Sequence, residues 1–192
     1  MSFRSCCIIL QLAFSSAVAV WVVLLLARGL GLRSPMTAFG TVGVALGIVV
    51  VNSSIISWSV PKRLMPVRAW EISGLTYPLL GISIFGKVLR LVPFRYLNTS
   101  VYIGGHRSDL LSTYANILQA EAAHYWAFTL TVPLIIYQFT CQSWYGLGWL
   151  FLFNALINIY PSLHLRQVRG RLEPLMQRCK EREKSKIRIP HK

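Results

Sequence analysis

Acidic residues are scarce in this sequence, which has six Asp and Glu against 20 Lys and Arg in 192 residues. Ahead of Glu173, the only acids are Glu71, Asp109 and Glu121. A carboxylate-bridged di-iron bundle needs four glutamates, two of them in Glu-x-x-His motifs on separate helices. This chain has a single such motif, from Glu121 to His124. The shortage of carboxylates therefore excludes a di-iron site.

Cysteine is also scarce, and several common motifs are missing. The four cysteines have no paired spacing, which excludes a disulfide framework and a zinc knuckle; they are Cys6, Cys7, Cys141 and Cys179. The sequence has no glycine-rich phosphate loop, no Ser-His-Asp arrangement and no internal repeat. The basic residues flank apolar runs, so we expect no nucleic-acid partner.

Apolar residues are what the chain has in abundance. Hydrophobic residues make up 54% of it and charged residues 14%. A bilayer-spanning helix needs roughly 20 apolar residues, and four runs approach or exceed that length: residues 7–27, 37–60, 126–140 and 144–163. The third run is short, but its helix should begin near Asp109. We predict an all-α membrane protein with about four transmembrane helices, in a single multi-pass domain (1–178) followed by a basic cytoplasmic tail (179–192).

The basic residues also predict how the chain is oriented. Cytoplasmic loops carry the excess of Lys and Arg, and seven such residues lie between the second and third runs. Both termini should then be cytoplasmic in a multi-pass protein of the cell membrane. The first run exceeds a signal-peptide core and lacks a cleavage site, so we expect it to be retained. Residues 77–93 are apolar but interrupted by Lys87 and Arg90, which is typical of an interfacial amphipathic segment.

Glu121 and His124 are the best candidates for chemistry. They lie three residues apart within one apolar helical stripe, and ionisable groups at membrane depth favour a functional interpretation. The carboxylate would orient the imidazole, which would act as a general base. A structural pair that bonds another helix is an equal alternative. A mononuclear metal held by these two residues and His106 or His164 has no further support, and we predict no metal.

A second polar group follows the turn near Gln142. Counting along an antiparallel hairpin from this turn brings that group within about two turns of His124. The residues expected to meet there are Asn154, Asn158, Tyr160, Arg166, Arg169 and Arg171. Taken singly, each asparagine is explained as well by interhelical hydrogen bonding as by a role in a site. Each arginine is explained as well by contact with anionic lipid.

Three stretches also resemble a known family, the glycosyl-4,4'-diaponeurosporenoate acyltransferases. They contain Trp-Glu-x-x-Gly-x-x-Tyr (70–77), Ala-Glu-x-x-His (120–124) and Asn-x-Tyr-Pro followed by Arg-x-x-Arg-x-Arg (158–171). The resemblance covers residues 70–178. Family members tend to have Tyr and Asn where this chain has Gln167 and Val168. If those two residues contact the sugar in the family, we expect this chain to use a different acceptor.

The resemblance implies transfer of a fatty acyl group to a sugar hydroxyl of a membrane-dissolved carotenoid glycoside. It implies no bound cofactor, and acyl-CoA or another acyl carrier as co-substrate. His124 would be the base, Glu121 its orienting partner, and Asn158 or Tyr160 the donor to the oxyanion. The remaining substrate-binding residues would be Arg166 and Arg169 at phosphates, with Arg171 and Asn154 nearby, and Trp70, Glu71 and Tyr77 at the sugar.

Two other classes stay open at this point. One is a non-enzymatic membrane assembly or scaffold subunit with membrane-protein partners, for which a glycine face (Gly43 and Gly47) and the basic tail would be interfaces. The other is a different small membrane transferase that acts on lipid or isoprenoid substrates. Membrane lipid is an expected partner in every case.

Overall fold

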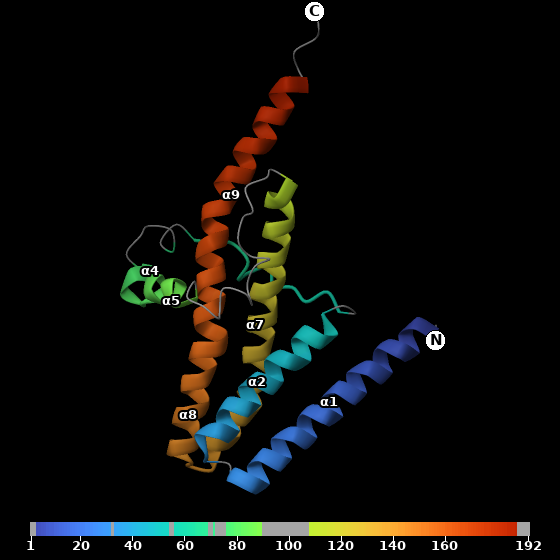
Figure 1. Cartoon of the computed structure of the whole chain (residues 1–192), viewed down its shortest axis with the longest axis vertical. Coiled ribbons are helices and arrows are strands. Elements are labelled where there is room, and N and C mark those ends of the chain that lie inside the picture. Colours follow the sequence, from blue (N-terminus) through green and yellow to red (C-terminus); the bar gives the residue numbers. More distant parts are fainter. Residues whose placement is uncertain are drawn as a thin grey trace, which may run out of the picture. The chain divides into compact units, whose positions relative to one another are not determined.

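The computed structural model is α-helical, and no strand occurs among its described residues, which are 3–31, 33–53, 56–68, 71, 76–89 and 108–187 (Figure 1). Its elements are α1 (Phe3–Leu30), α2 (Pro35–Asn52), α4 (Thr76–Leu79), α5 (Ile82–Leu89), α7 (Ser108–Thr140), α8 (Trp144–Asn154), the π-helix η2 (Ala155–Ile159) and α9 (Tyr160–Ile187). The all-α prediction is confirmed for this part of the chain.

The chain divides into two compact units. Unit 1 comprises Met1–Val60 and Glu121–Ser162, and unit 2 comprises Pro61–Ala120 and Leu163–Lys192. The divisions fall inside α7 and α9, so each of these helices contributes residues to both units. Each unit has buried apolar clusters of its own.

In unit 1, α2 packs against both α1 and α8. Val42, near its middle, is fully buried in a cluster with Leu150 of α8, and Leu134 of α7 packs against this cluster. Nearer its carboxyl end, Val49 is buried against Ala123 and Ala127 of α7. The position along α2 rises as the position along α7 falls, so the two helices run antiparallel.

The short connection between α7 and α8 makes the predicted hairpin. Residues 141–143 form the turn, and Gln142 takes a left-handed conformation with φ of 53°. The Ser143 N–H donates to the Gln138 carbonyl over 2.9 Å, which closes the end of α7. The sequence therefore predicted both the turn and the start of α7, which lies at Ser108 beside the expected Asp109.

Within the described part of the chain, three helical stretches are long and apolar enough to cross a membrane: Leu10–Leu30, Pro35–Asn52 and Trp144–Arg178. On α1, large apolar side chains such as Leu10, Phe14 and Trp21 are exposed, as expected for a helix that faces lipid. The chain is thus suited to association with a membrane. Residues 126–140, the third predicted span, lie within α7, and the count of four stays a prediction.

The second predicted span extends to residue 60, whereas α2 ends at Asn52. Polar side chains explain this early end, because Asn and Ser compete with the helical backbone for hydrogen bonds. The Asn52 amide donates to its own helix at the Ile48 carbonyl (2.7 Å) and to Ser15 Oγ of α1 (3.0 Å). The Ser53 hydroxyl donates back to the Val50 carbonyl over 2.6 Å.

Unit 2 contains α4 and α5, which correspond to most of the predicted interfacial segment; residues 90–93 of that segment lie outside the described part. Ile82 and Gly86 are buried on one face of α5, while Ile84 and Val88 are exposed apolar residues on the other. The core of the unit is formed by Ile117 of α7 and two leucines of α9. The segment is amphipathic, as the sequence predicted.

Gly86 allows α5 to approach α9 closely, which makes a testable prediction. A Cβ at this position would lie 2.7 Å from Cε1 and 3.0 Å from Nδ1 of the buried His164. We expect Gly86→Ala to destabilise the protein by about 1 kcal/mol, since overpacking outweighs the gain in helix propensity. Thermal denaturation in detergent measures this loss. Gly148→Ala is the control, because a Cβ there meets nothing within 4 Å; an equal melting temperature for both variants would contradict the packing argument.

Candidate functional site

Unit 1 holds a row of buried polar side chains between α7 and the α8–η2 segment. Asn158 Nδ2 donates to Asn154 Oδ1 over 2.6 Å, and Asn154 Nδ2 donates to Thr131 Oγ1 through a short hydrogen bond. The Thr131 hydroxyl in turn donates to the Phe128 carbonyl over 2.7 Å. Both asparagines are fully buried. Every donor in the row points the same way, so the row leaves one acceptor, Asn158 Oδ1, at its open end.

His124 lies at that open end. Its imidazole is within hydrogen-bonding range of the Asn158 side chain and the backbone of Ile157. His124 Nδ1 and Asn158 Oδ1 are both buried and make no bond of good geometry within the described part of the chain. Because the Asn158 amide nitrogen is already engaged, its oxygen can only accept from the imidazole. This arrangement suits the tautomer protonated at Nδ1, in which Nε2 carries the lone pair that can take a proton.

A local irregularity of the helix places Asn158. Residues Ala155–Ile159 form one turn of π-helix between α8 and α9. Such single turns are rare, often occur at functional sites and change the direction of the side chains that follow. The Asn154 and Asn158 side chains still bond to each other. The extra residue in the π-helical turn therefore determines where Asn158, the last residue of the row, lies.

Glu121 and Tyr160 complete the predicted polar group of unit 1. Glu121 is 2% exposed and lies on α7 one turn before His124. Tyr160 is half-buried at the start of α9. Both residues have interactions of their own. The burial of Glu121 supports the inward orientation that the helical stripe predicted.

Unit 2 holds a second polar group, centred on Glu71. Arg166 binds its carboxylate with two hydrogen bonds, Nε to Oε2 (2.5 Å) and Nη2 to Oε1 (3.0 Å). The Tyr77 hydroxyl donates to Oε2 over 3.2 Å. Burial opposes ionisation of Glu71, but the bonds and charge of Arg166, the Arg68 N–H and the Tyr77 hydroxyl outweigh it and lower the pKa of the carboxyl group. Glu71 is therefore ionised at neutral pH.

Arg166 and Arg169 hold the segment that precedes Glu71. Arg166 also donates to the Leu64 and Pro66 carbonyls, and Arg169, only 2% exposed, donates to the Met65 carbonyl over 2.6 Å. The guanidinium group of Arg169 also pairs with Glu173, 3.3 Å away. These two arginines therefore have protein partners on several sides.

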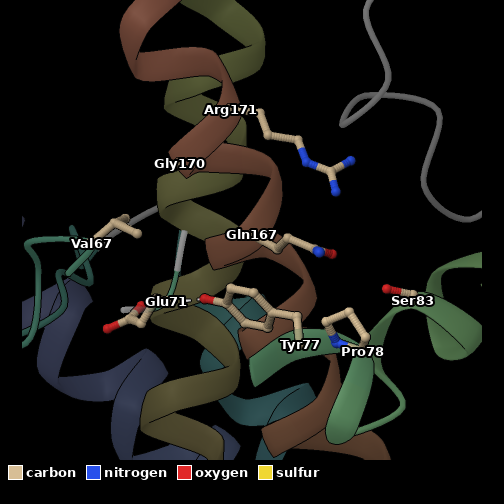
Figure 2. A pocket seen from close by; sticks show the side chains of 8 residues that line it. All are labelled: Val67, Glu71, Tyr77, Pro78, Ser83, Gln167, Gly170 and Arg171. Carbon is tan, nitrogen blue, oxygen red and sulfur yellow. Dashed lines mark hydrogen bonds between the residues drawn. The ribbon is translucent and has the colours of Figure 1, made fainter. Parts of the chain in front are cut away.

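A small pocket of about 120 Å³ lies beside Glu71 and Tyr77 (Figure 2). Gln167 and Arg171 extend into its surroundings from one face of α9, and Ser83 faces them from α5. Arg171 is exposed, and the Glu71–Arg166 pair is neutral as a whole, so the pocket is positive in net charge. It suits a polar or anionic group.

The predicted site residues thus fall into two groups. His124, Glu121, Asn154, Asn158 and Tyr160 belong to unit 1; the second group, in unit 2, comprises Glu71, Tyr77, Arg166, Arg169 and Arg171. Trp70 lies outside the described residues. The expected approach of the arginines to His124 would join the two units, and it stays a prediction.

Three residues of these sites were missed by the sequence reasoning. Thr131 lies seven residues after His124, which places it on the same face of α7, and this spacing was the available signal. Gln167 was noted only as a departure from the family, and it lies four residues before Arg171 on the same helix face. Ser83 had no comparable signal, because its place in the pocket depends on how α5 packs. No group of three or more potential metal ligands is present among the described residues.

The family model of the glycosyl-4,4'-diaponeurosporenoate acyltransferases matches residues 61–178, more than half of the chain. The protein belongs to this acyltransferase family. Searches of curated proteins and of solved structures gave no match. The region matched in this acyltransferase includes His124, Asn158, Glu71 and the pocket beside it, while α1 and α2 lie ahead of it. Both polar groups are thus in the part of the acyltransferase that defines the family.

Proposed function

We propose that the protein transfers a fatty acyl group from a thioester donor to a sugar hydroxyl of a lipid-soluble glycosylated acceptor, a carotenoid glycoside. Family membership supports acyl transfer and this class of acceptor. The observation that carries the proposal to a site is that the His124 imidazole lies within hydrogen-bonding range of Asn158 at the end of the polar row. His124 Nδ1 and Asn158 Oδ1 are both buried there without a bond of good geometry to the described residues.

His124 is the general base of the proposed reaction. Its Nε2 takes the proton of the acceptor hydroxyl while the hydroxyl oxygen forms a bond to the acyl carbon. The bond from that carbon to the sulfur of the carrier then breaks, and the imidazolium returns its proton to the leaving thiolate. Asn158 keeps Nδ1 protonated and fixes the ring, and Glu121, one turn earlier on α7, is the proposed orienting partner of the imidazole.

Stabilisation of the tetrahedral oxyanion requires a hydrogen-bond donor near Nε2. Asn158 already donates from Nδ2 to Asn154, and its side chain is within hydrogen-bonding range of His124, so we assign it a positioning role. The Tyr160 hydroxyl, two residues on, is the better donor to the oxyanion in this proposal. Asn154 supports the reaction indirectly, because it fixes the orientation of the Asn158 amide.

The pocket of unit 2 takes the polar part of a substrate. The guanidinium group of Arg171 suits a phosphate group of acyl-CoA or of another acyl carrier, whereas Arg166 and Arg169 hold the segment before Glu71. Gln167 and Ser83 offer neutral hydrogen bonds of the kind that sugars accept and donate. Trp70 and Tyr77 stay candidates for contact with the sugar.

We propose four membrane spans, with residues 126–140 of α7 as the third and both termini in the cytoplasm. The exposed apolar face of α5 and the adjacent Lys87 suit the membrane surface, where apolar side chains insert and bases meet anionic headgroups. An interfacial location brings a sugar hydroxyl and a water-soluble donor to the same depth. This supports a cell-membrane enzyme.

The test uses the purified protein in lipid vesicles with hexadecanoyl-CoA and glycosyl-4,4'-diaponeurosporenoate. Mass spectrometry should detect an acylated glycoside that depends on the protein, the donor and the acceptor. A parallel reaction with an alkyl glucoside asks whether the acceptor needs its polyene. Absence of any acylated product from folded protein in all donor and acceptor combinations would overturn the proposal.

A further inference from the structure

We infer that an apolar groove between α1, α2 and α7 holds the hydrocarbon chain of the acyl donor. This inference rests on the function proposed above and assigns it a chain-binding site. The groove belongs entirely to unit 1 and measures about 460 Å³, within the range of about 300–1,000 Å³ that is usual for small-molecule sites. Its walls are almost wholly apolar.

The three helices contribute distinct walls. Ala45 of α2 and Ala19 of α1 are small and buried, and they leave the space that forms the floor. Val20 and Leu24 of α1 form an exposed wall, at 59% and 56% exposure, so the groove opens toward the surroundings of the helix bundle. A chain dissolved in the bilayer can therefore enter from the side.

The groove lies on the helix face that carries His124. Thr131 lines it, and from His124 to Thr131 is seven residues, nearly two full turns and about 10 Å along α7. The same Thr131 accepts from Asn154 in the row that ends beside His124. One residue thus belongs both to the wall of the groove and to the polar row.

The helix register shows which end of the groove faces His124. At one end, Ile48 of α2 directly precedes Val49, which is buried against Ala123 and Ala127 on either side of His124. At the other end, Thr41 precedes Val42, whose cluster includes Leu134 further along α7. A hydrocarbon chain in the groove therefore has one end near Ile48 and the other near Thr41, and the end near Ile48 is the one closer to the His124 imidazole.

A fatty acyl chain fits this groove better than the polyene of the acceptor does. The groove runs from Thr41 to Ile48, about 10 Å along α2, which is short for a rigid extended polyene but sufficient for a flexible chain that can bend. In the donor, the reacting carbon is itself the end of the hydrocarbon. In the acceptor, the sugar ring separates the reacting hydroxyl from the hydrocarbon, which leaves the polyene further from the base.

The first experiment compares hexadecanoyl-CoA with octanoyl-CoA as donors. Val20→Trp and Ala45→Phe should each narrow the groove and lower the ratio of hexadecanoyl to octanoyl transfer at least about tenfold, since each lost methylene contact alters binding several-fold. Because Val20 is exposed, the Val20→Trp variant should fold as the wild type does. Val18→Trp on the same helix, outside the groove, is the matched control and should keep the wild-type ratio.

The outcomes separate this inference from the proposed function. Acyl transfer by the wild type with an unchanged ratio in both groove variants would overturn the groove and leave the function standing. Failure of the wild type with both donors would overturn the function and with it the groove. A binding experiment that needs no turnover uses a diazirine-bearing hexadecanoyl-CoA on His124→Ala protein. We expect it to label groove peptides of α2 and α7; labelling that excess phospholipid abolishes would identify a membrane-lipid site instead.

Discussion

Replacing His124 by Ala should lower the rate of acyl transfer by a factor of about 10² to 10⁴, the usual contribution of a general base. The variant removes the imidazole that lies at the open end of the Asn158–Asn154–Thr131 row. The measurement is the initial rate of acylated glycoside formation in vesicles, at saturating donor and acceptor. Because alanine leaves no group that can take the hydroxyl proton, the loss should fall on kcat.

The controls for this prediction separate chemistry from packing. His124→Gln keeps a side chain that can donate to Asn158 Oδ1 but has no basic nitrogen, so it should lose activity as fully as alanine does. Its melting temperature in detergent should stay closer to that of the wild type, because the glutamine amide can donate to the buried Asn158 Oδ1. Wild-type activity in either variant would exclude His124 as the base.

The sequence predicted those parts of unit 1 that depend on periodicity. The helical stripe of α7 correctly predicted that Glu121 is buried. The bond from Asn154 to Thr131 of α7 is the interhelical hydrogen bond that the sequence left open as an alternative to substrate binding. The π-helix Ala155–Ile159 could not be predicted in this way, because one extra residue in a helical turn leaves no mark on composition or spacing. The exact end of the polar row beside His124 depends on that insertion.

In unit 2, the sequence predicted which residues matter but not which partners they have. Glu71, Tyr77 and Arg166 were all candidates, yet their roles were assigned separately, to sugar and to phosphate. Residues 71 and 166 are far apart in the sequence, and only packing shows that they form a buried ion pair. The sequence also could not predict that the carbonyl groups of residues 64–66 accept hydrogen bonds from Arg166 and Arg169, because every residue has a backbone carbonyl group.

The second large effect that we expect is on stability, at the pair of Glu71 and Arg166. The two side chains are 8% and 15% exposed, and removal of one partner from a buried pair leaves the other charge uncompensated. Arg166→Met should lower the free energy of unfolding by about 2 to 4 kcal/mol, because it strands the Glu71 carboxylate and also frees the Leu64 and Pro66 carbonyls. Glu71→Gln should lower the free energy of unfolding less, since Arg166 still donates to the Leu64 and Pro66 carbonyls.

Two measurements establish that the pair itself is responsible. In a double-mutant cycle, Glu71→Gln should partly offset Arg166→Met, so the combined loss is smaller than the sum by about 1 kcal/mol or more; strict additivity would contradict a direct interaction.

The pH dependence of stability gives the second measurement. The pKa of Glu71 in the folded protein lies below its ordinary value of 4.5, so below that value the unfolded chain takes up a proton first. The stabilisation is complete above this pH and is lost as the pH falls through the folded-state pKa. Wild-type protein should therefore lose melting temperature on acidification below about pH 5, and Glu71→Gln should lose less, because glutamine does not titrate.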